Sequence, residues 1–361
     1  MRRLALRSSI LGRIVLVFAV SISCLSAGEL ETPKLRSVHL APAPRAADGR
    51  YENLAGEMIR ARFGVRFPFF MRRIAGSFRT RPGEPPRIAN NGIFLRYNAK
   101  HSIPTVTWVG HSTLLVQMGG VTFLTDPIWS NTPSPISFVG PRRFVEPGID
   151  LDDLPPIDFV VISHNHYDHL DLPTLVDLAE LDPETRFLVP KGNGDLLRSK
   201  GIAQVEEFDW GDVTRHEGVE IHCLPSQHWS KRGIGDDQKA LWASWGITGP
   251  ERRFYFAGDT GYFDGFRRIG EALGPFDLAA VPIGAYEPVE MMQYSHMNPE
   301  ESVKSAIDLD ARRALAIHFG TFDLSDEPLD EPPRRFLDAA HGSDLGQESA
   351  WVMRIGETRA F

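Results

Sequence analysis

Short apolar runs recur along the chain from Thr105 onward, and turn-forming Gly, Pro, Asn and Asp residues separate them. Runs of this length, rich in β-branched and aromatic residues, predict β-strands. The first three flank tight turns such as Gly119-Gly120 and predict a β-meander. The predicted strands are 105–109, 113–118, 121–126, 159–163, 187–190, 220–225, 241–248, 253–257, 278–282, 314–318 and 351–355.

Helical periodicity appears between the later strands. Asn298-Pro299-Glu300-Glu301 is typical of a helix N-terminus, because it combines a capping side chain with proline in the first turn. The predicted helices are 172–181, 195–200, 265–273 and 299–309. Hairpins in the first half and strands alternating with helices in the second predict an α+β chain, with two sheets sandwiched between outer helices.

The N-terminus has the three regions of a secretory signal peptide. Residues 1–13 are basic, residues 14–25 are apolar, and Ser26-Ala27-Gly28 are small. The apolar run is short for a membrane span. We therefore predict a signal peptide at 1–27 and an exported protein, periplasmic or associated with the envelope membrane.

Two alternatives to cleavage stay open. The signal could be retained as an anchor, or a lipid could be attached at Cys24, although Ser21-Ile22-Ser23 fits the attachment pattern poorly. Residues 28–50, rich in Pro, Ala and Arg, are expected to form a linker or disordered arm, and residues 51–361 the folded domain.

Composition limits the function further. The chain has 361 residues, of which 42% are hydrophobic, enough for one large or two moderate domains. After cleavage near Ala27, Cys223 would be the only cysteine, which excludes an intramolecular disulfide. The four arginines lost would take the formal net charge from −8 to −12, and such acidity argues against a general nucleic-acid surface.

One segment departs from this acidity. Between Arg60 and Lys100, ten Lys or Arg residues stand against the single acid Glu84, interleaved with Phe63, Phe67, Phe69, Phe70, Met71 and Phe78. We call residues 60–100 the basic–aromatic segment. Such a mixture is expected of a surface that meets an anionic membrane. The alternative is an amphipathic helix that packs its aromatics into the core, although Pro68 interrupts the segment.

The strongest chemical signal is His164-Asn165-His166-Tyr167-Asp168-His169-Leu170-Asp171, which follows the apolar run 159–162. Imidazole and carboxylate are ligands that zinc prefers, and a turn at a strand end can aim alternate side chains at one point. The alternative, a polar turn whose histidines cap backbone groups, leaves this crowding of ligands unexplained. The motif therefore predicts a metal site.

The motif offers four ligands, His164, His166, Asp168 and His169. If they cannot all reach one tetrahedral ion, two ions are implied, and other strand ends must supply the remaining ligands. Three candidates follow apolar runs: His228, Asp259 and His318. A single histidine after a strand is more often structural, but together with the motif these residues predict ligands. Asp259 is the carboxylate suited to bridge two dications.

These motifs, with blocks outside them, resemble the metallo-β-lactamase superfamily and, within it, the N-acylphosphatidylethanolamine-hydrolysing phospholipase D family. The resemblance covers roughly residues 50–361. It rests on Trp108-Val109-Gly110-His111-Ser112-Thr113, Leu124-Thr125-Asp126-Pro127, Val139-Gly140-Pro141-Arg142-Arg143-Phe144, Gln227-His228-Trp229, Phe256-Ala257-Gly258-Asp259-Thr260-Gly261-Tyr262, Gly274-Pro275-Phe276-Asp277-Leu278-Ala279-Ala280, Pro282-Ile283-Gly284-Ala285-Tyr286-Glu287-Pro288 and Ile317-His318-Phe319-Gly320-Thr321-Phe322.

The resemblance implies a hydrolase domain with the αβ/βα four-layer sandwich of the superfamily, two mixed β-sheets flanked by helices, and two zinc ions per chain. One ion would take His164, His166 and His228, the other Asp168, His169 and His318, with Asp259 shared. Asp126 would lie behind the ligands and orient their loop. The implied catalytic residues are Asp168, Asp259 and His296, the last for substrate binding or leaving-group protonation. Candidates for the substrate cleft are Gln227, Tyr262, Met291, Met292 and Tyr294.

The activity implied is phospholipase D-type hydrolysis of an N-acylphosphatidylethanolamine-like phospholipid by a metal-bound hydroxide, giving phosphatidic acid and an N-acylethanolamine. A metal-dependent lactonase or carboxylic ester hydrolase would use the same centre, and a non-catalytic zinc-binding envelope protein would need no open position. The basic–aromatic segment favours a lipid. The sequence leaves open manganese or iron in place of zinc, the acyl-chain preference, and whether the protein is a homodimer.

Overall fold

The computed structural model describes residues 35–36, 41–56, 58, 60–76, 86–135 and 140–361. The predicted signal peptide, and residues 28–34 and 37–40 of the predicted arm, lie outside these residues. Residues 41–50, which we expected to belong to a linker or disordered arm, pack against the domain. Ala43 is buried, and its backbone N–H donates to Oδ1 of Asp209 at 2.9 Å.

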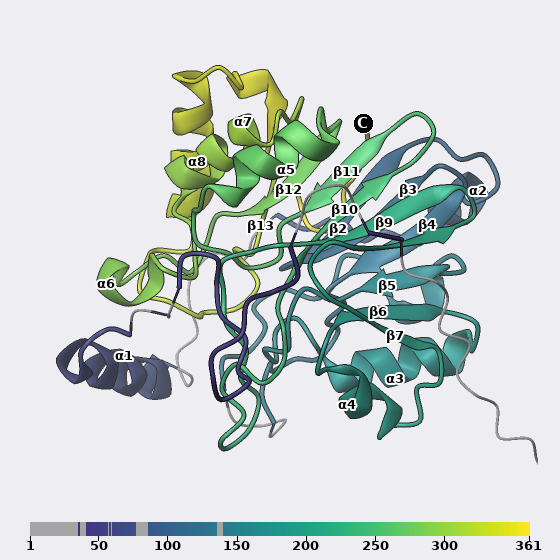
Figure 1. Ribbon diagram of the computed structural model, residues 1–361. Helices are drawn as coiled ribbons and strands as arrows, with labels where there is room; N and C mark the ends of the chain where they lie inside the picture. Colours follow the sequence, from purple (N-terminus) through teal and green to yellow (C-terminus); the bar gives the residue numbers. More distant parts are fainter. Residues whose placement is uncertain (1–34, 37–40, 57, 59, 77–85, 136–139) are drawn as a thin grey trace, which may run out of the picture. The chain divides into compact units, whose positions relative to one another are not determined.

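Within the described residues, two mixed sheets stack face to face (Figure 1). One sheet has the order β1 (Leu35–Arg36), β8 (Asp212–His216), β9 (Val219–Leu224), β10 (Ser244–Thr248), β11 (Arg253–Phe256), β12 (Leu278–Pro282), β13 (Ala314–Ile317) and β14 (Ala350–Trp351). The other has the order β15 (Thr358–Ala360), β2 (Thr105–Gly110), β3 (Thr113–Met118), β4 (Val121–Thr125), β5 (Phe159–Val161), β6 (Arg186–Pro190) and β7 (Val205–Phe208).

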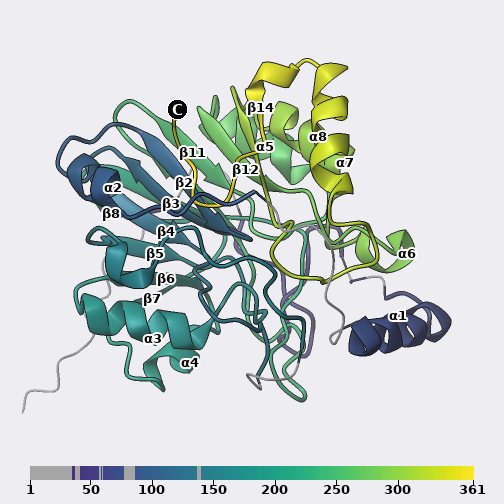
Figure 2. The same cartoon turned by 180° about the vertical axis from the view of Figure 1, so that it is seen from behind.

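Helices cover the outer face of each sheet (Figures 1 and 2). The first sheet carries α5 (Gly265–Leu273), α7 (Pro299–Asp308) and α8 (Glu331–His341), and the second carries α3 (Leu172–Leu181) and α4 (Gly194–Arg198). The remaining described helices are α1 (Phe63–Gly76), α2 (Ile93–Asn98) and α6 (Val289–Met292), besides short 3₁₀ turns at Leu151–Asp153 and Gln347–Ser349. None of the helices in the described part of the chain is long and apolar enough to cross a membrane.

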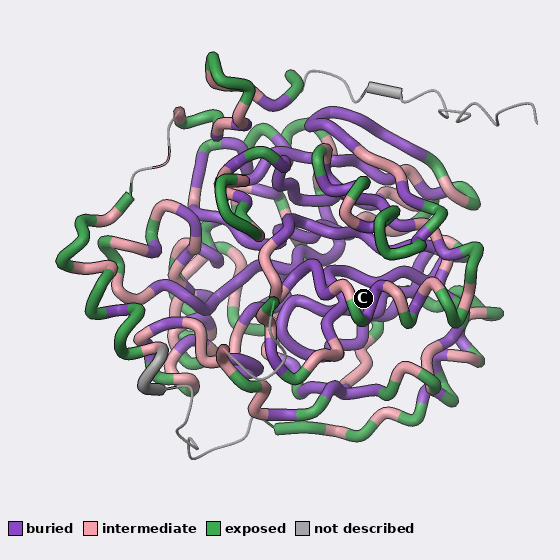
Figure 3. Tube along the Cα trace, turned by 90° about the horizontal axis from the view of Figure 1, so that it is seen from below, coloured by how far each residue is buried: buried purple, intermediate pink, exposed green. Residues whose placement is uncertain are grey.

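Three apolar layers fill the spaces between these elements, and buried chain fills the centre of the domain (Figure 3). Alternation along β5 and β11 explains the layers, because successive side chains of a strand point to opposite faces. Phe159 and Phe254 enter the layer between the sheets, whereas Val160 and Tyr255 pack under the outer helices. Both faces of each sheet are therefore buried, which confirms the predicted sandwich.

The strand arrangement differs from the prediction in one respect. Hairpins were expected in the first half, but each sheet combines antiparallel and parallel strands. The strands β2–β3–β4 and β8–β9–β10–β11 are antiparallel, whereas β4–β5–β6–β7 and β11–β12–β13–β14 are parallel. Strands β1, β7, β8 and β15 were not predicted. The strand predicted at 351–355 is wrong beyond Trp351: Ile355 forms only an isolated bridge with Arg87, and the next strand begins at Thr358.

Helix predictions were accurate where periodicity and capping agreed. The helix α7 begins with a capping box, in which Asn298 accepts from the backbone N–H of Glu301 at 2.8 Å. For residues 60–100 a helix was expected from the sequence only as an alternative, with Pro68 as the objection, yet α1 forms there and runs through Pro68. The sequence missed α8, whose first turn contains Pro332 and Pro333, where proline is well tolerated.

Candidate metal centre

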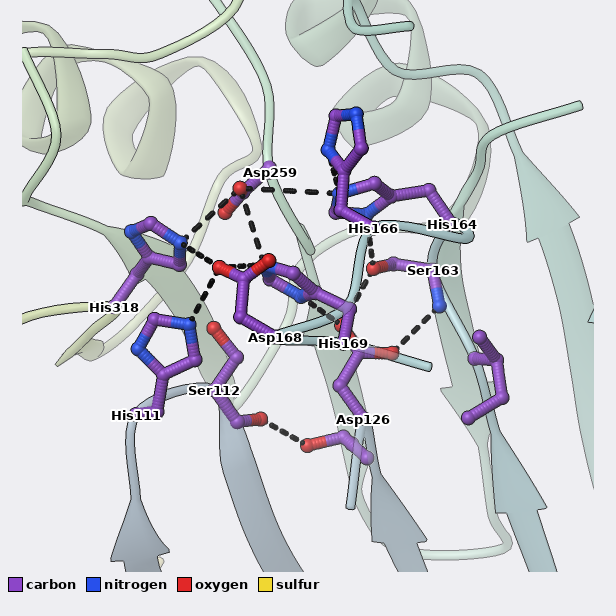
Figure 4. Close-up of polar contacts among 12 residues, drawn as sticks. His111, Ser112, Asp126, Ser163, His164, His166, Asp168, His169, Asp259 and His318 are labelled. Carbon is purple, nitrogen blue, oxygen red and sulfur yellow. Dashed lines mark hydrogen bonds and ion pairs between the residues drawn. The ribbon is translucent and has the colours of Figure 1, made fainter. Parts of the chain in front are cut away.

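The predicted ligands come together at one edge of the sandwich because they follow the carboxyl ends of strands that run in the same direction. Asp126 follows β4, the His164–Asp171 motif follows β5, and Asp259 and His318 follow β11 and β13. His228 comes after β9, which is antiparallel to β10 and therefore runs with β11. The sheets converge here, so side chains far apart in sequence meet (Figure 4).

The first cluster consists of three histidines. Nδ1 of His166 lies 2.8 Å from Nε2 of His164 and 3.2 Å from Nε2 of His228. The outer nitrogens are held from behind: Nδ1 of His228 donates to the carbonyl of Ser295 at 2.9 Å, and Nδ1 of His164 lies 2.9 Å from Oγ of Ser163. These contacts fix the tautomers so that the Nε2 lone pairs of His164 and His228 point into the cluster.

The second cluster combines Asp168, His169 and His318. Oδ2 of Asp168 lies 3.4 Å from Nε2 of His169 and 3.5 Å from Nε2 of His318. Asp259 stands between the clusters: its Oδ2 is 3.1 Å from Nε2 of both His169 and His318 and 4.0 Å from Nε2 of His164. The arrangement places Asp259 where a shared carboxylate would lie.

Gly258 allows this close approach. It has φ +59°, and a Cβ there would lie 2.3 Å from Cβ of Ser163. A larger residue would push Asp259 away from the motif that follows β5. Asp126 supports the same region, because its carboxylate accepts from Nδ1 of His169 and from the backbone N–H of Ser163, both at 2.6 Å.

The two clusters differ in charge. In the first, burial is the main cause that lowers the pKa of His166 to about 4, and burial with neighbouring imidazoles holds the pKa values of His164 and His228 well below that of an ordinary histidine. Its three nitrogens are therefore neutral near pH 7 and have lone pairs for a metal.

In the second cluster, burial opposes the charged form of every group, but the attraction between unlike charges is stronger. Asp259 and Asp168 raise the pKa of His318 to about 9, and they hold the pKa of His169 well above its usual value. In return, His169 and its neighbours hold the pKa of both carboxyls well below the usual range. The two carboxylates thus favour positive charge at this cluster.

Unsatisfied atoms test whether metal ions fit here. Buried polar atoms normally have hydrogen-bond partners. Among the described residues, buried atoms without such a partner include Nε2 of His169, Oδ1 of Asp259 and Nε2 of His318. The ligand atoms of each cluster also lie within 4.8 Å of one another. Imidazole and carboxylate groups at these separations fit divalent metal ions.

A cavity of about 530 Å³ opens onto the clusters. His166, Asp168, Asp259, His296 and His318 line its inner end. The walls are largely apolar and include Met58, Phe70, Trp229, Met291, Met292 and Leu324. Charged side chains also line it, namely Arg60, Arg66, Lys231 and Asp237. A ligand in this cavity would meet metal-binding groups, cations and apolar walls together.

Comparison with known proteins agrees with this picture. A family model described as a β-lactamase superfamily domain matches residues 122–319. The chain is 42% identical over 266 residues to N-acyl-phosphatidylethanolamine-hydrolyzing phospholipase D 1 of Caenorhabditis elegans, covering 70% of this chain and 74% of the relative. The chain therefore belongs to the N-acylphosphatidylethanolamine-hydrolysing phospholipase D family of the β-lactamase superfamily. It is also 34% identical over 262 residues to the mitochondrial protein of the same name from Saccharomyces cerevisiae, covering 71% of this chain and 55% of that protein.

Solved structures support the fold alone. The metallo hydrolase Igni18 of Ignicoccus hospitalis superposes with a TM-score of 0.56 at 24% identity and covers 72% of this chain and 99% of that chain. The resemblance to the N-acylphosphatidylethanolamine-hydrolysing phospholipase D family and to the metallo-β-lactamase fold, both expected from the sequence, is thus confirmed. A relative from Methanopyrus kandleri, 28% identical over 238 residues, is named a metal-dependent hydrolase, and this chain has clusters of histidine and aspartate that could hold a metal.

The residues that we expected around the substrate of this family member divide into two groups. Met291, Met292 and His296 line the cavity. Gln227, Tyr262 and Tyr294 do not belong to its lining, because their polar groups serve the surrounding loops. Nε2 of Gln227 donates to the carbonyl of Tyr294 at 3.1 Å, the Tyr294 hydroxyl donates to the carbonyl of Gly56 at 3.1 Å, and the Tyr262 hydroxyl donates to Asp308.

Sequence reasoning did not place several residues at the metal centre or its cavity, although the structure does. Arg60, Arg66 and Phe70 from the basic–aromatic segment reach the cavity, and their clustered charges and aromatic rings were the only signal. His111 lies behind Asp168, with its Nε2 3.0 Å from Oδ2 of Asp168. It was part of the family resemblance, but a single histidine in a short turn gave no reason to single it out.

Proposed function

We propose that the protein is a dinuclear zinc phosphodiesterase that hydrolyses N-acylphosphatidylethanolamine-like phospholipids to phosphatidic acid and an N-acylethanolamine. The observation that carries the proposal is the cavity in which the two ligand clusters, the cationic groups Arg60, Arg66 and Lys231, and an apolar wall meet. The relative from C. elegans is named for this reaction.

The combination of charged and apolar side chains in the cavity suits a phospholipid. Its phosphodiester is anionic and would lie at the inner end, near the clusters and the cations. Its acyl chains would pack against Phe70 of α1 and against Met291 and Met292 of α6, all of which line the cavity. A small polar lactone would make no use of these apolar side chains, so the cavity favours the lipid over the lactonase alternative.

In the proposed centre, His164, His166 and His228 hold one zinc ion, Asp168, His169 and His318 hold the other, and Asp259 is shared. When bound, two such ions lower the pKa of a water and neutralise charge on the phosphodiester oxygens. Overall, the water oxygen bonds to phosphorus, the bond between phosphorus and the ethanolamine oxygen breaks, and that oxygen gains a proton. The chain itself has to orient the phosphodiester and exclude competing ligands.

His296 is placed to orient the substrate. It lines the cavity, and its Nδ1 lies 3.8 Å from Oδ2 of Asp259. Burial, the main cause, lowers its pKa to about 4. Near pH 7 it is therefore a neutral imidazole, which donates a hydrogen bond more readily than a proton. We assign His296 to substrate binding in preference to protonation of the leaving group.

We also propose that α1 faces a membrane with an anionic surface. Phe63, Phe67, Phe70 and Met71 are each about half exposed or more. Helix α6 lies beside α1 (Figures 1 and 2), and its Val289 is exposed as well. Since Phe70 also lines the cavity, this apolar surface adjoins the proposed entrance for lipid.

Export is the compartment that we propose, on the basis of the N-terminal sequence. The proposal predicts that a mature chain begins near residue 28 and is recovered from the cell envelope or periplasm. N-terminal sequencing of the protein from fractionated cells tests it, and a cytosolic chain that retains Met1 would contradict it.

A hydrolysis panel tests the reaction. Purified protein, with its metal content measured, would be assayed on N-acylphosphatidylethanolamine, a simple phosphodiester and lactones. We expect roughly two zinc ions per chain and the highest kcat/KM on the phospholipid, with phosphatidic acid as a product. Preference for lactones would overturn the assignment in favour of the lactonase, and metal binding without any turnover would favour the non-catalytic alternative.

A further inference from the structure

We propose that His111 is a positioning residue of the metal centre, which holds the carboxylate of Asp168 in place by donating a hydrogen bond from Nε2–H. The inference rests on the proposed metal centre and extends it to a residue behind the ligands. It concerns one contact, the 3.0 Å separation between Nε2 of His111 and Oδ2 of Asp168 (Figure 4).

His111 lies as close to the second cluster as the ligands lie to one another, but hydrogen bonding sets it apart. Nε2 of His169 and Nε2 of His318 have no hydrogen-bond partner, whereas Nε2 of His111 is hydrogen-bonded to Asp168. Oδ2 of Asp168 lies 3.4 Å from Nε2 of His169 and 3.5 Å from Nε2 of His318, separations suited to atoms that share an ion. The contact to His111 is shorter and has the length of a hydrogen bond. An ionised carboxylate is only an acceptor, so the nitrogen must carry the proton. A carboxylate oxygen has lone pairs for both partners, and it can accept this bond while facing a metal.

The backbone holds His111 in an unusual conformation. His111 and Ser112 form the turn between β2 and β3, and His111 has φ +52°, a region that residues other than glycine seldom adopt. Such conformations persist only where the surroundings determine them, and they concentrate at functional sites. The conformation directs the imidazole toward Asp168 instead of along the hairpin.

Hydrogen bonds tie this turn to the loop that carries His318. The backbone N–H of His111 donates to Oγ1 of Thr321 at 2.8 Å, and its carbonyl accepts from the backbone N–H of His318 at 3.1 Å. The same carbonyl accepts from the indole N–H of Trp108 at 2.9 Å. His111 therefore moves with the His318 loop, and its imidazole links that loop to Asp168.

Packing prevents the imidazole from turning away. The ring of His111 lies 4.2 Å from the ring of His318 and meets the edge of Phe322 at 5.2 Å, measured between centroids. The guanidinium of Arg143 covers Phe322 at 4.9 Å. His111 itself is 1% exposed.

Asp168 is the most exposed ligand of the second cluster. Its side chain is 14% exposed, whereas those of His169, Asp259 and His318 are 2% exposed or less. It also lines the cavity, so water or substrate can compete for its oxygens. The hydrogen bond from His111 restricts rotation of the Asp168 carboxylate and keeps Oδ2 turned toward His169 and His318.

Three variants test the proposal. His111→Gly removes the donor and also relieves the positive φ, His111→Ala removes the donor alone, and His111→Gln keeps an N–H near the position of Nε2. His222→Gln is the matched control, because His222 is a buried histidine of β9 that belongs to none of the ligand clusters. Thermal unfolding of the metal-free proteins shows which variants fold.

Metal binding is measured by competition with a chromophoric zinc chelator and by the visible absorption of the cobalt-substituted protein. We expect His111→Gly and His111→Ala to bind one of the two ions about 10- to 100-fold more weakly, and His111→Gln to regain most of that loss. The cobalt spectrum should keep the same number of nitrogen ligands. With an active preparation, kcat should fall while KM stays the same.

Two results would overturn the proposal. Unchanged affinity for both ions in folded His111→Gly would show that the contact does not support the centre. A cobalt spectrum that loses a nitrogen ligand in both His111→Gly and His111→Gln would make His111 a ligand instead. Neither measurement uses a substrate, so a failure of the phospholipase assignment in the hydrolysis panel leaves this test intact.

Discussion

Asp126 accepts a hydrogen bond from Nδ1 of His169 over 2.6 Å, and both side chains are completely buried. The contact reaches the metal centre from behind, because Nε2 of His169 points at Asp259. Burial alone raises the pKa of Asp126, and hydrogen bonds from His169 and Ser163 oppose that shift. The carboxylate therefore orients His169 and increases the basicity of the nitrogen that faces the metal.

Replacement of Asp126 should weaken zinc binding without preventing folding. In Asp126→Asn, an amide N–H would be able to face Nδ1–H of His169, and one buried donor would lose its acceptor at a cost of about 1–3 kcal/mol. We expect zinc affinity at the second cluster to fall by about 10- to 100-fold, measured by chelator competition.

Asp158→Asn is the matched control for this variant. Asp158 also accepts a backbone N–H, from Thr122 at 2.6 Å, but its side chain is 35% exposed and it precedes β5 instead of following it. Equal zinc affinities of the two variants would show that Asp126 has no part in holding the ion.

The pH dependence of zinc binding should differ between the two clusters. Without a metal, His318 has a pKa of about 9, because Asp259 and Asp168 outweigh the effect of burial, and the pKa of His169 lies well above its usual value. Both are protonated at pH 7 and must release protons to bind zinc. The pKa of His166 is about 4, so the first cluster has no such protons to release.

Affinity for the ion at the second cluster should therefore rise with pH between 6 and about 9, by up to about 100-fold per pH unit where two protons are displaced. Affinity at the first cluster should change little over the same range. Calorimetric titration with zinc in buffers of different ionisation enthalpy counts the protons released. Equal proton release for the two ions would contradict this assignment of charges.

The apolar surface of α1 should bind membranes. At about 1.5 kcal/mol for each phenylalanine transferred from water, the double variant Phe63→Ser with Phe67→Ser should bind vesicles of mixed neutral and anionic phospholipids roughly 100-fold more weakly. Sedimentation with vesicles measures the effect. The control is Ile93→Ser with Phe94→Ser on α2, which is similarly exposed and lies on the other side of the domain (Figures 1 and 2).

Arginine substitutions test the same surface less directly. Arg73 pairs with Asp326 at 2.9 Å and donates to the carbonyl of Ser325, so its replacement would loosen α1 itself. The side chain of Arg62 is mostly exposed and lies 3.8 Å from Glu290, so Arg62 is the better site for charge reversal.

If the variant with Phe63→Ser and Phe67→Ser binds vesicles as well as the α2 control does, α1 is not the membrane surface.

Much of the metal centre could be predicted from the sequence because strand ends are visible as apolar runs followed by polar residues. His164, Asp259 and His318 each follow such a run, and parallel strands bring such positions to one edge. The position of His228 was harder to predict from the strand pattern, because it follows an antiparallel strand and a turn. The grouping of the ligands into two sets was implied by the family resemblance and stays a prediction, although the side chains of each set lie close together.

The parts that were missed or left open depend on tertiary contacts that a sequence pattern does not encode. Helix α1 runs through Pro68, and its Arg73 is held by acidic residues some 250 positions away. Gln227 precedes the predicted ligand His228, and Tyr294 precedes the cavity residue Ser295. The polar groups of Gln227 and Tyr294 nevertheless form hydrogen bonds to loop carbonyls and do not face the cavity. His111 gains its place only because the turn after β2 meets the loop after β13.

Asp259 provides the most direct test of a shared ligand. Its Oδ2 contacts Nε2 of His169 and His318 at 3.1 Å and approaches Nε2 of His164 at 4.0 Å, so its charge serves both clusters. Asp259→Asn removes that charge and keeps the shape. We expect the zinc content to fall from roughly two ions per chain to one or fewer, and kcat on the preferred substrate to fall by at least about 100-fold.

Asp209→Asn is a suitable control, because Asp209 is a buried carboxylate that accepts the backbone N–H of Ala43 at 2.9 Å and lies outside the ligand clusters. Circular dichroism of the metal-free variants confirms that both fold. Since protonated His169 and His318 depend on Asp259 for compensation, metal-free Asp259→Asn should also show lower pKa values for these histidines in a proton NMR titration. Retention of both zinc ions and of turnover would mean that another group bridges the two clusters.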